Sequence, residues 1–425
     1  MNLKSLALLT TAAVSLPLFA ESLTFTGTSD KNPLLYKVGE PMTFTVTLVD
    51  KAAKNAPVKG RKLTWTRQGD DGKTEKGEAL SDAPLTVTTQ IDKPGFVRLT
   101  VKVLGPDGKP VKAEGRKDRD VVFDGGAGAG VNDIPTTPPP KDFDAFWDAQ
   151  LARMASVPME GQLTPIKAKD ANVVLNTFTV NTVPGEGPAT GLVAWPKDAK
   201  PGSLKMLVHV TGYGFGATGI SNGEVTGKGG LLVVSITRHG ENPRAPEAYY
   251  KNLQTNVLKS YCWRNVRTKT ANDEFKMIMR DVRALAFVKT LPQWNGKDIK
   301  VTGGSMGGFQ SVALAALDRQ VTECSPFVPW MSDLAGKTNF KRMGGWLPDW
   351  TEELAYIDTA NLATRVTCPV TMGIGLGDYV CPPSGEMILF RNFKGPKTMT
   401  ATQNMGHGSQ YGVNSPSYTF KDAIR

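Results

Sequence analysis

The chain has 425 residues, of which 40% are hydrophobic and 21% are charged. That length exceeds a usual single domain and the composition excludes wholesale disorder, so two folded domains are expected. The formal net charge is +10. However, the lysines are interleaved with acids and apolar residues and no nucleic-acid motif occurs, so we expect no nucleic-acid partner.

The first 20 residues resemble an export signal. Lys4 is followed by a short apolar run that ends at Ala20, which is the pattern of a cleaved signal peptide. The run is too short to cross a bilayer, and no later segment is long and apolar enough to do so. The sequence therefore predicts a periplasmic or secreted protein without membrane insertion.

Residues 21–124 alternate between apolar and polar side chains. Strands are expected at 42–49, 62–66 and 97–103. Glycine- and proline-containing turns separate them. Short alternating strands of this kind predict an immunoglobulin-like β-sandwich. No cluster of acids, histidines or cysteines occurs here, so both a structural spacer and a glycan-binding module stay open.

A glycine- and proline-rich segment, residues 125–140, follows the predicted sandwich. Its composition is typical of a linker. Immediately after it, Phe143, Phe146 and Trp147 recur at helical spacing, and we expect this helix to pack on the next domain.

Residues 141–425 alternate between strand and helix patterns. Strands are expected at 176–182, 190–195, 205–210, 231–236, 298–304 and 368–378, and helices at 274–291 and 309–318. Several strands are continuous apolar runs, as expected for strands covered on both faces. The pattern predicts an α/β domain with a mostly parallel sheet covered by helices.

The sequence Gly303-Gly304-Ser305-Met306-Gly307 stands between a predicted strand and a predicted helix. This is the G-x-S-x-G pattern of a sharp turn that exposes a nucleophilic serine at a helix N-terminus. We interpret Ser305 as the nucleophile; the alternative is an ordinary glycine-rich turn.

A serine nucleophile needs a base, and the chain has three histidines. His209 lies within a predicted strand and is expected to be packed, and His239 could line a pocket. The chain order serine, acid, histidine favours His407 as the base. Asp378, at the end of a late strand, is then the orienting acid.

The oxyanion hole needs two backbone donors. The amide that follows the nucleophile, that of Met306, supplies one. The loop after the strand at 205–210 supplies the other, and we expect it to be the amide of Tyr213 between two glycines.

The four cysteines, at positions 262, 324, 368 and 381, match neither a zinc site nor a disulfide scaffold. Buried thiols are expected at Cys324 and Cys368, and a disulfide stays open. We expect no metal and no organic cofactor.

From about residue 140 onward the chain resembles the acetyl xylan esterase / cephalosporin-C deacetylase family, carbohydrate esterase family seven. The resemblance rests on the sequences "DFDAFWD", "TGYGFG", "VTGGSMGGFQSVALAALD", "VPWMSD" and "GLGDYVCPP" together with the late His407. It implies an α/β-hydrolase fold, a Ser305–Asp378–His407 triad, oxyanion amides from Tyr213 and Met306, and removal of acetyl groups from sugars. The chain departs from the family in having Met306 where glutamine is usual, and in matching the Arg-Gly-Gln stretch only loosely around Arg238.

The leading hypothesis is therefore a serine esterase that deacetylates O-acetylated carbohydrate through an acetyl-enzyme. Trp330 would wall the acyl pocket, Trp346 and Trp350 would form a sugar-stacking rim, and Arg238 would contact substrate. The alternatives are an exported prolyl-oligopeptidase-like peptidase and an inactive glycan-binding protein. Whether the chain forms a homo-oligomer stays open.

Overall fold

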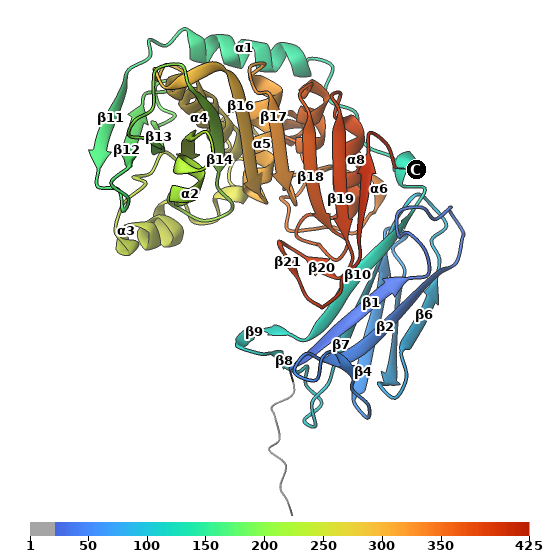
Figure 1. Ribbon diagram of the computed structural model, residues 1–425. Coiled ribbons are helices and arrows are strands. Elements are labelled where there is room, and N and C mark those ends of the chain that lie inside the picture. Colours follow the sequence, from blue (N-terminus) through green and yellow to red (C-terminus); the bar gives the residue numbers. More distant parts are fainter. Residues whose placement is uncertain (1–21, 425) are drawn as a thin grey trace, which may run out of the picture.

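A computed structural model describes residues 22–424 of the chain. The predicted signal peptide therefore lies outside the described residues. Figure 1 shows an N-terminal region made of strands and a larger region of helices around a long sheet. None of the helices in residues 22–424 is long and apolar enough to cross a membrane.

The N-terminal β-rich region, as far as the structure describes it, contains two four-stranded sheets that share one hydrophobic core. One sheet holds β1 (Leu23–Ser29), β2 (Met42–Asp50), β3 (Ala56–Pro57) and β6 (Leu85–Thr89). The other holds β10 (Val122–Ala129), β7 (Gly95–Val103), β4 (Lys62–Gly69) and β5 (Thr74–Leu80). A small hairpin of β8 (Lys112–Ala113) and β9 (Arg116–Asp120) extends from it. The predicted alternation holds, since Met42, Phe44 and Val46 are all buried.

The prediction that residues 125–140 form a linker is wrong for its first part. Gly125 to Ala129 belong to β10, which pairs with β7 along its whole length. These glycines lie where another part of the chain comes close: a Cβ on Gly126 would stand 2.8 Å from the Leu376 carbonyl oxygen. The glycine run therefore reflects close packing rather than flexibility.

The remaining connection runs through a short 3₁₀ turn, η1 (Val131–Asp133), into the predicted helix α1 (Phe143–Ala155). Phe143 and Trp147 are buried, as the helical spacing predicts. The Trp147 indole N–H donates to the Tyr356 carbonyl oxygen at 2.9 Å, which fastens α1 to the α/β region.

Within residues 22–424 the α/β region has one ten-stranded sheet. In spatial order it contains β11 (Gly161–Ile166), β12 (Val173–Val180), β13 (Ala189–Pro196), β15 (Leu231–Ile236), β14 (Leu204–Val210), β16 (Trp294–Gly304), β17 (Glu323–Phe327), β18 (Val370–Gly375), β19 (Lys397–Thr402) and β22 (Ser417–Lys421). The central ladders from β15 to β19 are parallel and the outer ones are antiparallel. The mostly parallel centre matches the prediction, whereas the ladders β11–β12, β12–β13, β13–β15 and β19–β22 toward the edges are antiparallel.

Helices cover the sheet on both faces. The α-helices are α2 (Asn222–Thr226), α3 (Glu247–Asn252), α4 (Asp273–Val288), α5 (Met306–Leu317), α6 (Gly336–Phe340), α7 (Thr359–Leu362) and α8 (Pro383–Asn392). Shorter turns are the π-helical η2 (Leu253–Val257) and the 3₁₀ turns η3 (Tyr261–Trp263), η4 (Glu352–Tyr356) and η5 (Ala363–Arg365). Val225 of α2 packs with Ala194 and Val233. Their neighbours Val193 and Val234 face the main core with α4 and α5.

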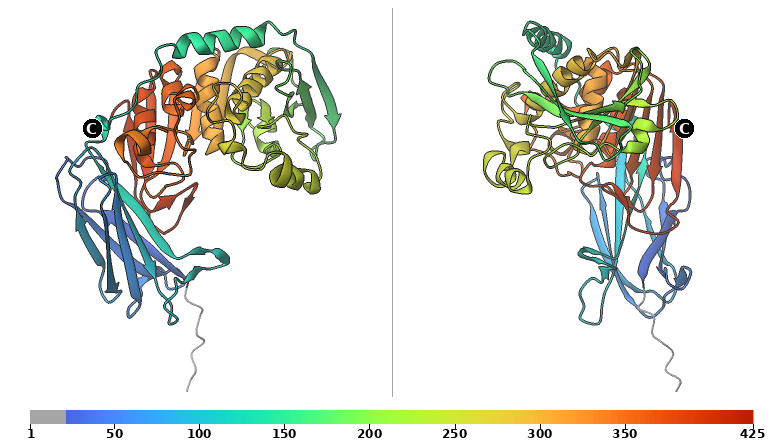
Figure 2. Two further views of the ribbon diagram at one scale, coloured as in Figure 1. Left: turned by 180° about the vertical axis from the view of Figure 1, so that it is seen from behind. Right: turned by 60° about the vertical axis from the view of Figure 1, so that its left-hand side comes forward.

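The two regions meet beside the small hairpin of β20 (Met405–Gly406) and β21 (Ser409–Gln410). Figure 2 shows this hairpin and the ends of β18 and β19 next to β10. Apolar residues of the β-rich region, Leu34 and Phe96, are part of the core of the α/β region. The two regions are therefore packed together rather than joined only by a connecting segment.

Candidate active site

Ser305 occupies the sharp turn between β16 and α5. Its backbone has φ 58° and ψ −119°, a conformation that residues with a side chain rarely adopt. The flanking glycines have no room for a methyl group: a Cβ on Gly303 would lie 2.5 Å from the Val210 carbonyl oxygen, and one on Gly307 would overlap the same atom. The structure therefore has the predicted strand-turn-helix, and the turn is packed against the end of β14.

His407 and Asp378 come to this serine from loops far along the chain. His407 Nε2 lies 2.9 Å from Ser305 Oγ, and its Nδ1 lies 2.8 Å from Asp378 Oδ2. With Nδ1–H donating to Asp378, Nε2 can accept the serine proton. The structure thus brings together all three residues that the sequence singled out.

Asp378 is fully buried and its carboxylate is held in one orientation. Its Oδ1 accepts hydrogen bonds from the backbone N–H groups of Val380 at 2.9 Å and Cys381 at 3.0 Å. Its Oδ2 is left for His407. The acid can therefore fix the tautomer of the imidazole and stabilise its protonated form.

The expected oxyanion donors both lie beside Ser305. Met306 is the first residue of α5, where backbone N–H groups lack an acceptor within the helix. Tyr213 lies in the loop after β14, and its neighbour Gly212 is so near the turn that a Cβ would stand 3.3 Å from the Gly304 carbonyl oxygen. This placement suits an oxyanion hole between the two amides.

Arg238, which was expected to contact substrate, has a buried side chain that binds the loop after β14 instead of facing solvent. Its Nε donates to the Gly214 carbonyl oxygen at 2.9 Å, and its guanidinium also donates to Thr211 Oγ1 and the Gly212 carbonyl oxygen. Burial lowers the pKa of Arg238 from its usual value. These hydrogen bonds hold the backbone on both sides of Tyr213.

His239 packs in the same interior rather than in an open pocket. Its ring lies 4.3 Å from that of Tyr261 and 5.6 Å from that of Phe215, measured between centroids. Among the described residues neither ring nitrogen has a hydrogen-bond partner. Burial lowers the pKa of His239 well below its usual value, so the ring is neutral at pH 7. The Nε2 atom of His209, in β14, lies 3.0 Å from Oε1 of Glu224, a residue of α2.

The tryptophans divide into different roles. Trp330 is 0% exposed, so it has no face to offer a substrate, and the prediction that it walls the acyl pocket is wrong. Its indole N–H donates to the Trp346 carbonyl oxygen at 2.6 Å, and the two rings lie 5.5 Å apart. Trp330 therefore supports Trp346, which was expected at the sugar-stacking rim.

Trp346 belongs to an aromatic cluster with Tyr213 and Trp263. Its ring lies 5.1 Å from that of Tyr213 and 4.7 Å from that of Trp263. Tyr213 is 48% and Trp263 40% exposed. Sequence reasoning missed Trp263 because it lies in η3, within a segment that has neither strand nor helix periodicity.

Phe327 is a second site residue that the sequence did not reveal. It ends β17, is 40% exposed, and its carbonyl oxygen accepts a hydrogen bond from the Ser305 amide at 2.9 Å. Its ring packs against Gly373 of β18. A large exposed apolar residue at the carboxyl end of a central strand was the available signal.

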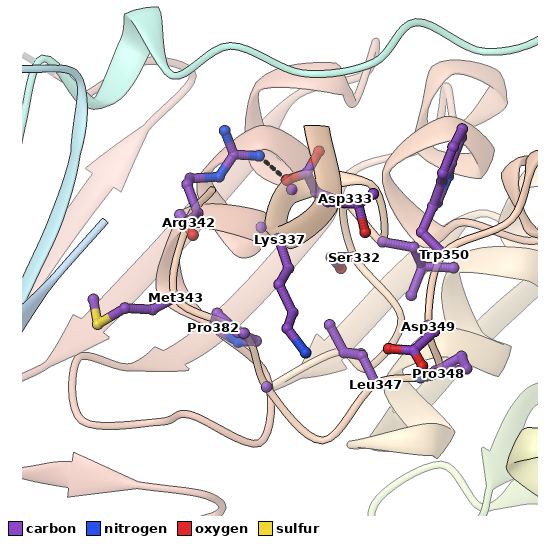
Figure 3. Close-up of a pocket in the computed structure, with 17 residues that line it drawn as sticks. Ser332, Asp333, Lys337, Arg342, Met343, Leu347, Pro348, Asp349, Trp350 and Pro382 are labelled. Carbon is purple, nitrogen blue, oxygen red and sulfur yellow. Dashed lines mark hydrogen bonds and ion pairs between the residues drawn. The ribbon is translucent and has the colours of Figure 1, made fainter. Parts of the chain in front are cut away.

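Trp350 lies outside the aromatic cluster. It lines a pocket between α6 and the following loop, together with Lys337, Leu347 and Asp349 (Figure 3). A buried ion pair between Arg342 and Asp333 forms part of the wall of this pocket. None of the residues that line it is Ser305, His407 or Asp378. Trp350 also borders a second pocket, beside Lys269 and Tyr356, that again contains none of these three residues.

Two further groups border Asp378. Glu386 is fully buried, and within residues 22–424 its carboxyl oxygens have no hydrogen-bond partner. Burial, together with the neighbouring Asp378, raises the pKa of Glu386 well above its usual value. Burial likewise raises the pKa of the Cys381 thiol. All four cysteines, which lie in the described part of the chain, are unpaired thiols.

The side chains of Asp378, Cys381 and His407 each place one potential metal ligand within 4.8 Å of the others. The donor set includes a nitrogen and a carboxylate oxygen that hydrogen-bond to each other in the structure. A cation bound there would displace that bond, so the site suits proton transfer better than metal binding.

Comparison with known proteins shows that the α/β region matches a known protein family. A family model described as acetyl xylan esterase (AXE1) matches residues 133–343 and 349–423. The unmatched residues 344–348 include Trp346, and the β-rich region before residue 133 lies outside the match.

A curated relative, acetyl esterase Axe7A of Xylanibacter ruminicola, is 29% identical over 299 residues, which cover 63% of this chain and 63% of the relative. Solved structures of an acetyl xylan esterase from Paenibacillus sp. R4 and of acetyl xylan esterase 1 from Thermoanaerobacterium sp. JW/SL YS485 share the fold. The first has a TM-score of 0.56 and 23% identity and covers 65% of this chain and 93% of its own. The second has a TM-score of 0.54 and 24% identity and covers 65% and 92%. The α/β region therefore has an α/β-hydrolase fold, and the chain belongs to the acetyl xylan esterase family.

Proposed function

We propose that the protein is a serine esterase that removes acetyl groups from O-acetylated carbohydrate such as xylan or xylo-oligosaccharides. The observation that carries this proposal is the hydrogen-bonded series Ser305–His407–Asp378, with distances of 2.9 and 2.8 Å. Membership of the acetyl xylan esterase family supports the choice of an acetyl ester.

In the proposed reaction Ser305 Oγ attacks the acetyl carbonyl carbon while His407 Nε2 takes the hydroxyl proton. The negative charge that develops on the carbonyl oxygen is stabilised by the amides of Tyr213 and Met306. His407 then protonates the sugar oxygen as the carbon–oxygen bond breaks, which leaves an acetyl-enzyme. Water, deprotonated by His407, attacks this ester and releases acetate, and the proton returns to Ser305.

The aromatic cluster of Tyr213, Trp263 and Trp346 supports a sugar as the alcohol part of the substrate. Pyranose rings present flat C–H faces that stack on aromatic side chains, and two members of the cluster are substantially exposed. Tyr213 links the cluster to the reaction, since its own amide is one of the proposed oxyanion donors.

The remaining expectations complete the proposal. The β-rich region is an immunoglobulin-like sandwich, and residues 1–20 are a signal peptide that directs export to the periplasm or beyond. Sequencing the N-terminus of the exported protein tests the cleavage: a mature chain that begins near Glu21 is expected, and one that retains Met1 would contradict export by this signal.

The experiment that tests the activity compares the wild type with Ser305→Ala. The wild type should hydrolyse a chromogenic acetate and release acetate from acetylated xylan, whereas Ser305→Ala should lose at least about 10⁴-fold in kcat. Ser325→Ala, which removes a hydroxyl from β17, is the matched control and should keep wild-type turnover. Cleavage of proline-containing peptides instead would support a peptidase, and no turnover by the wild type would support a glycan-binding protein.

A further inference from the structure

We propose that the N-terminal β-rich region is part of the catalytic apparatus: β10 holds the loops that carry His407 and Asp378, with Gln403 and Asn404 as positioning residues. We call the contact between the two regions at this point the domain seam, or seam. Its first side is β10 with the neighbouring residues Phe25 and Arg98. Its second side is residues 376–379 and 403–413. The proposal uses the proposed esterase activity only as one of its readouts.

The His407 loop is tied to β10 through the side chain of Gln403. Its Oε1 accepts from the Gly126 N–H at 2.8 Å, and its Nε2 donates to the Gly126 carbonyl oxygen at 2.9 Å. Both ends of the amide thus bind the backbone of a single residue of β10. Gln403 is 0% exposed, so these bonds form in an interior where an unpaired partner would be costly.

Asn404 makes a second connection in the same direction. Its Oδ1 accepts from the Asp124 N–H at 3.0 Å, and its Nδ2 donates to the Phe25 carbonyl oxygen at 3.4 Å. The Val413 N–H also donates to the Phe25 carbonyl oxygen, at 3.3 Å. Both ends of the loop that contains His407 are therefore held by strands of the β-rich region.

The loop that carries Asp378 meets the same strand by close backbone packing. A Cβ on Gly377 would overlap the Asp124 carbonyl oxygen, and a Cβ on Gly126 would lie 2.8 Å from the Leu376 carbonyl oxygen. The turn that directly precedes Asp378 thus rests on the backbone of β10 with no space for a methyl group.

An ion pair between β7 and β10, both in the β-rich region, borders the seam next to Asp378. Arg98 binds Asp124 through two hydrogen bonds, Nε to Oδ1 at 2.8 Å and Nη2 to Oδ2 at 2.6 Å. The guanidinium also lies over the ring of Tyr379, 4.3 Å from its centroid. Tyr379 is the residue immediately after Asp378, so the stacked guanidinium, held in place by Asp124, contacts the same loop from the β-rich region.

The catalytic geometry depends on the seam because the His407 loop has little support of its own. It contains only the two-residue strands β20 and β21 and projects from the end of the sheet toward β10 (Figure 1). Ser305, in contrast, is fixed within the α/β region by β16 and α5. Because Ser305 and His407 are held by different regions, the seam affects the distance between them. Displacing one catalytic group by about 1 Å can cost about 10²-fold in rate, so a weakened seam should lower the rate.

The test uses Gln403→Met in the full-length protein, because methionine keeps the volume and loses both hydrogen bonds. We expect kcat for a chromogenic acetate to fall by about 10- to 100-fold while KM changes by less than about threefold. The rate at which a fluorophosphonate probe labels Ser305 should fall by a similar factor. The control is Lys93→Ala, which removes another bond between the two regions, Lys93 Nζ to the Phe340 carbonyl oxygen at 3.3 Å, away from the catalytic loops.

Lys93→Ala should keep the wild-type kcat and labelling rate even if its melting temperature falls as much as that of Gln403→Met. Wild-type kcat and labelling in a folded Gln403→Met protein, or equal losses in both variants, would overturn the proposal. If Gln403→Met does not fold, the double variant Arg98→Leu/Asp124→Asn, which removes both charges of the seam pair together, decides by the same criteria. If the wild type hydrolyses no acetate, the proposed function fails, and the labelling rates still test the seam.

Discussion

Two buried carboxyl groups, those of Asp378 and Glu386, lie near each other at this site and differ in their hydrogen bonding. Asp378 accepts two backbone hydrogen bonds and one from His407, so each of its oxygens has a defined partner. Glu386 lies in the same interior, and burial together with the neighbouring Asp378 raises its pKa well above the usual value. The charged form of Glu386 is therefore disfavoured next to Asp378, which keeps its hydrogen bond to His407.

Arg238 is the residue whose role differs most from the sequence interpretation, and it allows a direct test. The guanidinium of Arg238 donates hydrogen bonds to three acceptors around Tyr213, and the single ammonium group of a lysine cannot replace all three. Because the loop that carries Tyr213 would then be held less firmly, Arg238→Lys should lower kcat by about 10- to 100-fold. Steady-state kinetics with a chromogenic acetate measure this effect.

The matched control is Arg283→Lys. Arg283 is also buried and donates to backbone carbonyl oxygens of Asn181, Val157 and Pro158, away from the active site. Its substitution should lower stability and leave kcat within about twofold. An equal loss of kcat in the two variants would contradict the bracing role of Arg238.

Glu274, at the start of α4, predicts a pH dependence of stability. Burial is the main cause that raises the pKa of the Glu274 carboxyl to about 8. The folded state therefore holds a proton that the unfolded chain releases near its usual pKa of about 4.5. The stabilisation is complete below that value and is lost as the pH rises toward about 8.

Glu274→Gln removes this titration. Its melting temperature, relative to that of the wild type, should rise steadily between about pH 5 and pH 8. Thermal unfolding across that range, with Glu352→Gln on the surface of η4 as the control, measures the difference. A difference that is constant with pH would show that the Glu274 carboxyl is not protonated in the folded state.

At the scale of elements, the junction of β14, β16 and α5 determines the position of Ser305. The junction is tight because Val210, at the end of β14, touches both glycines that flank Ser305. Within the first turn of α5 an alanine would ordinarily be favoured over glycine by about 1 kcal/mol. Here the added methyl group has no space, so packing outweighs helix propensity.

Gly307→Ala should therefore lower both the melting temperature and the labelling of Ser305 by a fluorophosphonate probe, because the overlap forces the turn away from β14. Gly223→Ala in α2 is the control: its new Cβ would meet only Ser221 Oγ at 3.6 Å. This control should match the wild type or be slightly more stable. A fully active, stable Gly307→Ala protein would contradict the steric account of the turn.

At the scale of the whole molecule, the formal net charge of +10 becomes relevant to polymeric substrates. Positive charge attracts polysaccharides that carry carboxylate groups, and salt screens this attraction because the Debye length falls from about 10 Å at 0.1 M to about 3 Å at 1 M. Small neutral esters are unaffected by such steering.

If acetylated, uronate-bearing xylan is a substrate, its KM should rise severalfold between about 20 mM and about 500 mM NaCl, whereas the KM of a chromogenic acetate should stay within about twofold. Acetate release measured in parallel with both substrates tests this. An unchanged KM for the polymer, or the same increase for both substrates, would show that net charge does not guide substrate binding.

The sequence alone predicted that Ser305, Asp378 and His407 come together, because each is marked by local features. Ser305 lies in a glycine-flanked turn between strand and helix, Asp378 ends a predicted strand, and His407 is the only histidine after the last predicted strand. The order of elements along the chain then predicts which ends of the strands meet. The alternation of apolar and polar residues along the chain is local information of the same kind. The division into a β-rich and an α/β region, and the α/β fold itself, could therefore also be predicted from the sequence.

Tertiary structure decided the features that depend on what surrounds a side chain. Whether Trp330 faces substrate or supports Trp346, and whether Arg238 meets solvent or loop carbonyls, follows from packing between distant segments. The glycines of residues 125–129 could not be assigned from composition, since glycine serves equally in a flexible linker and in a strand approached closely by another backbone. Only the folded molecule places β10 against the loops that carry Asp378 and His407, because those contacts join residues far apart in the chain.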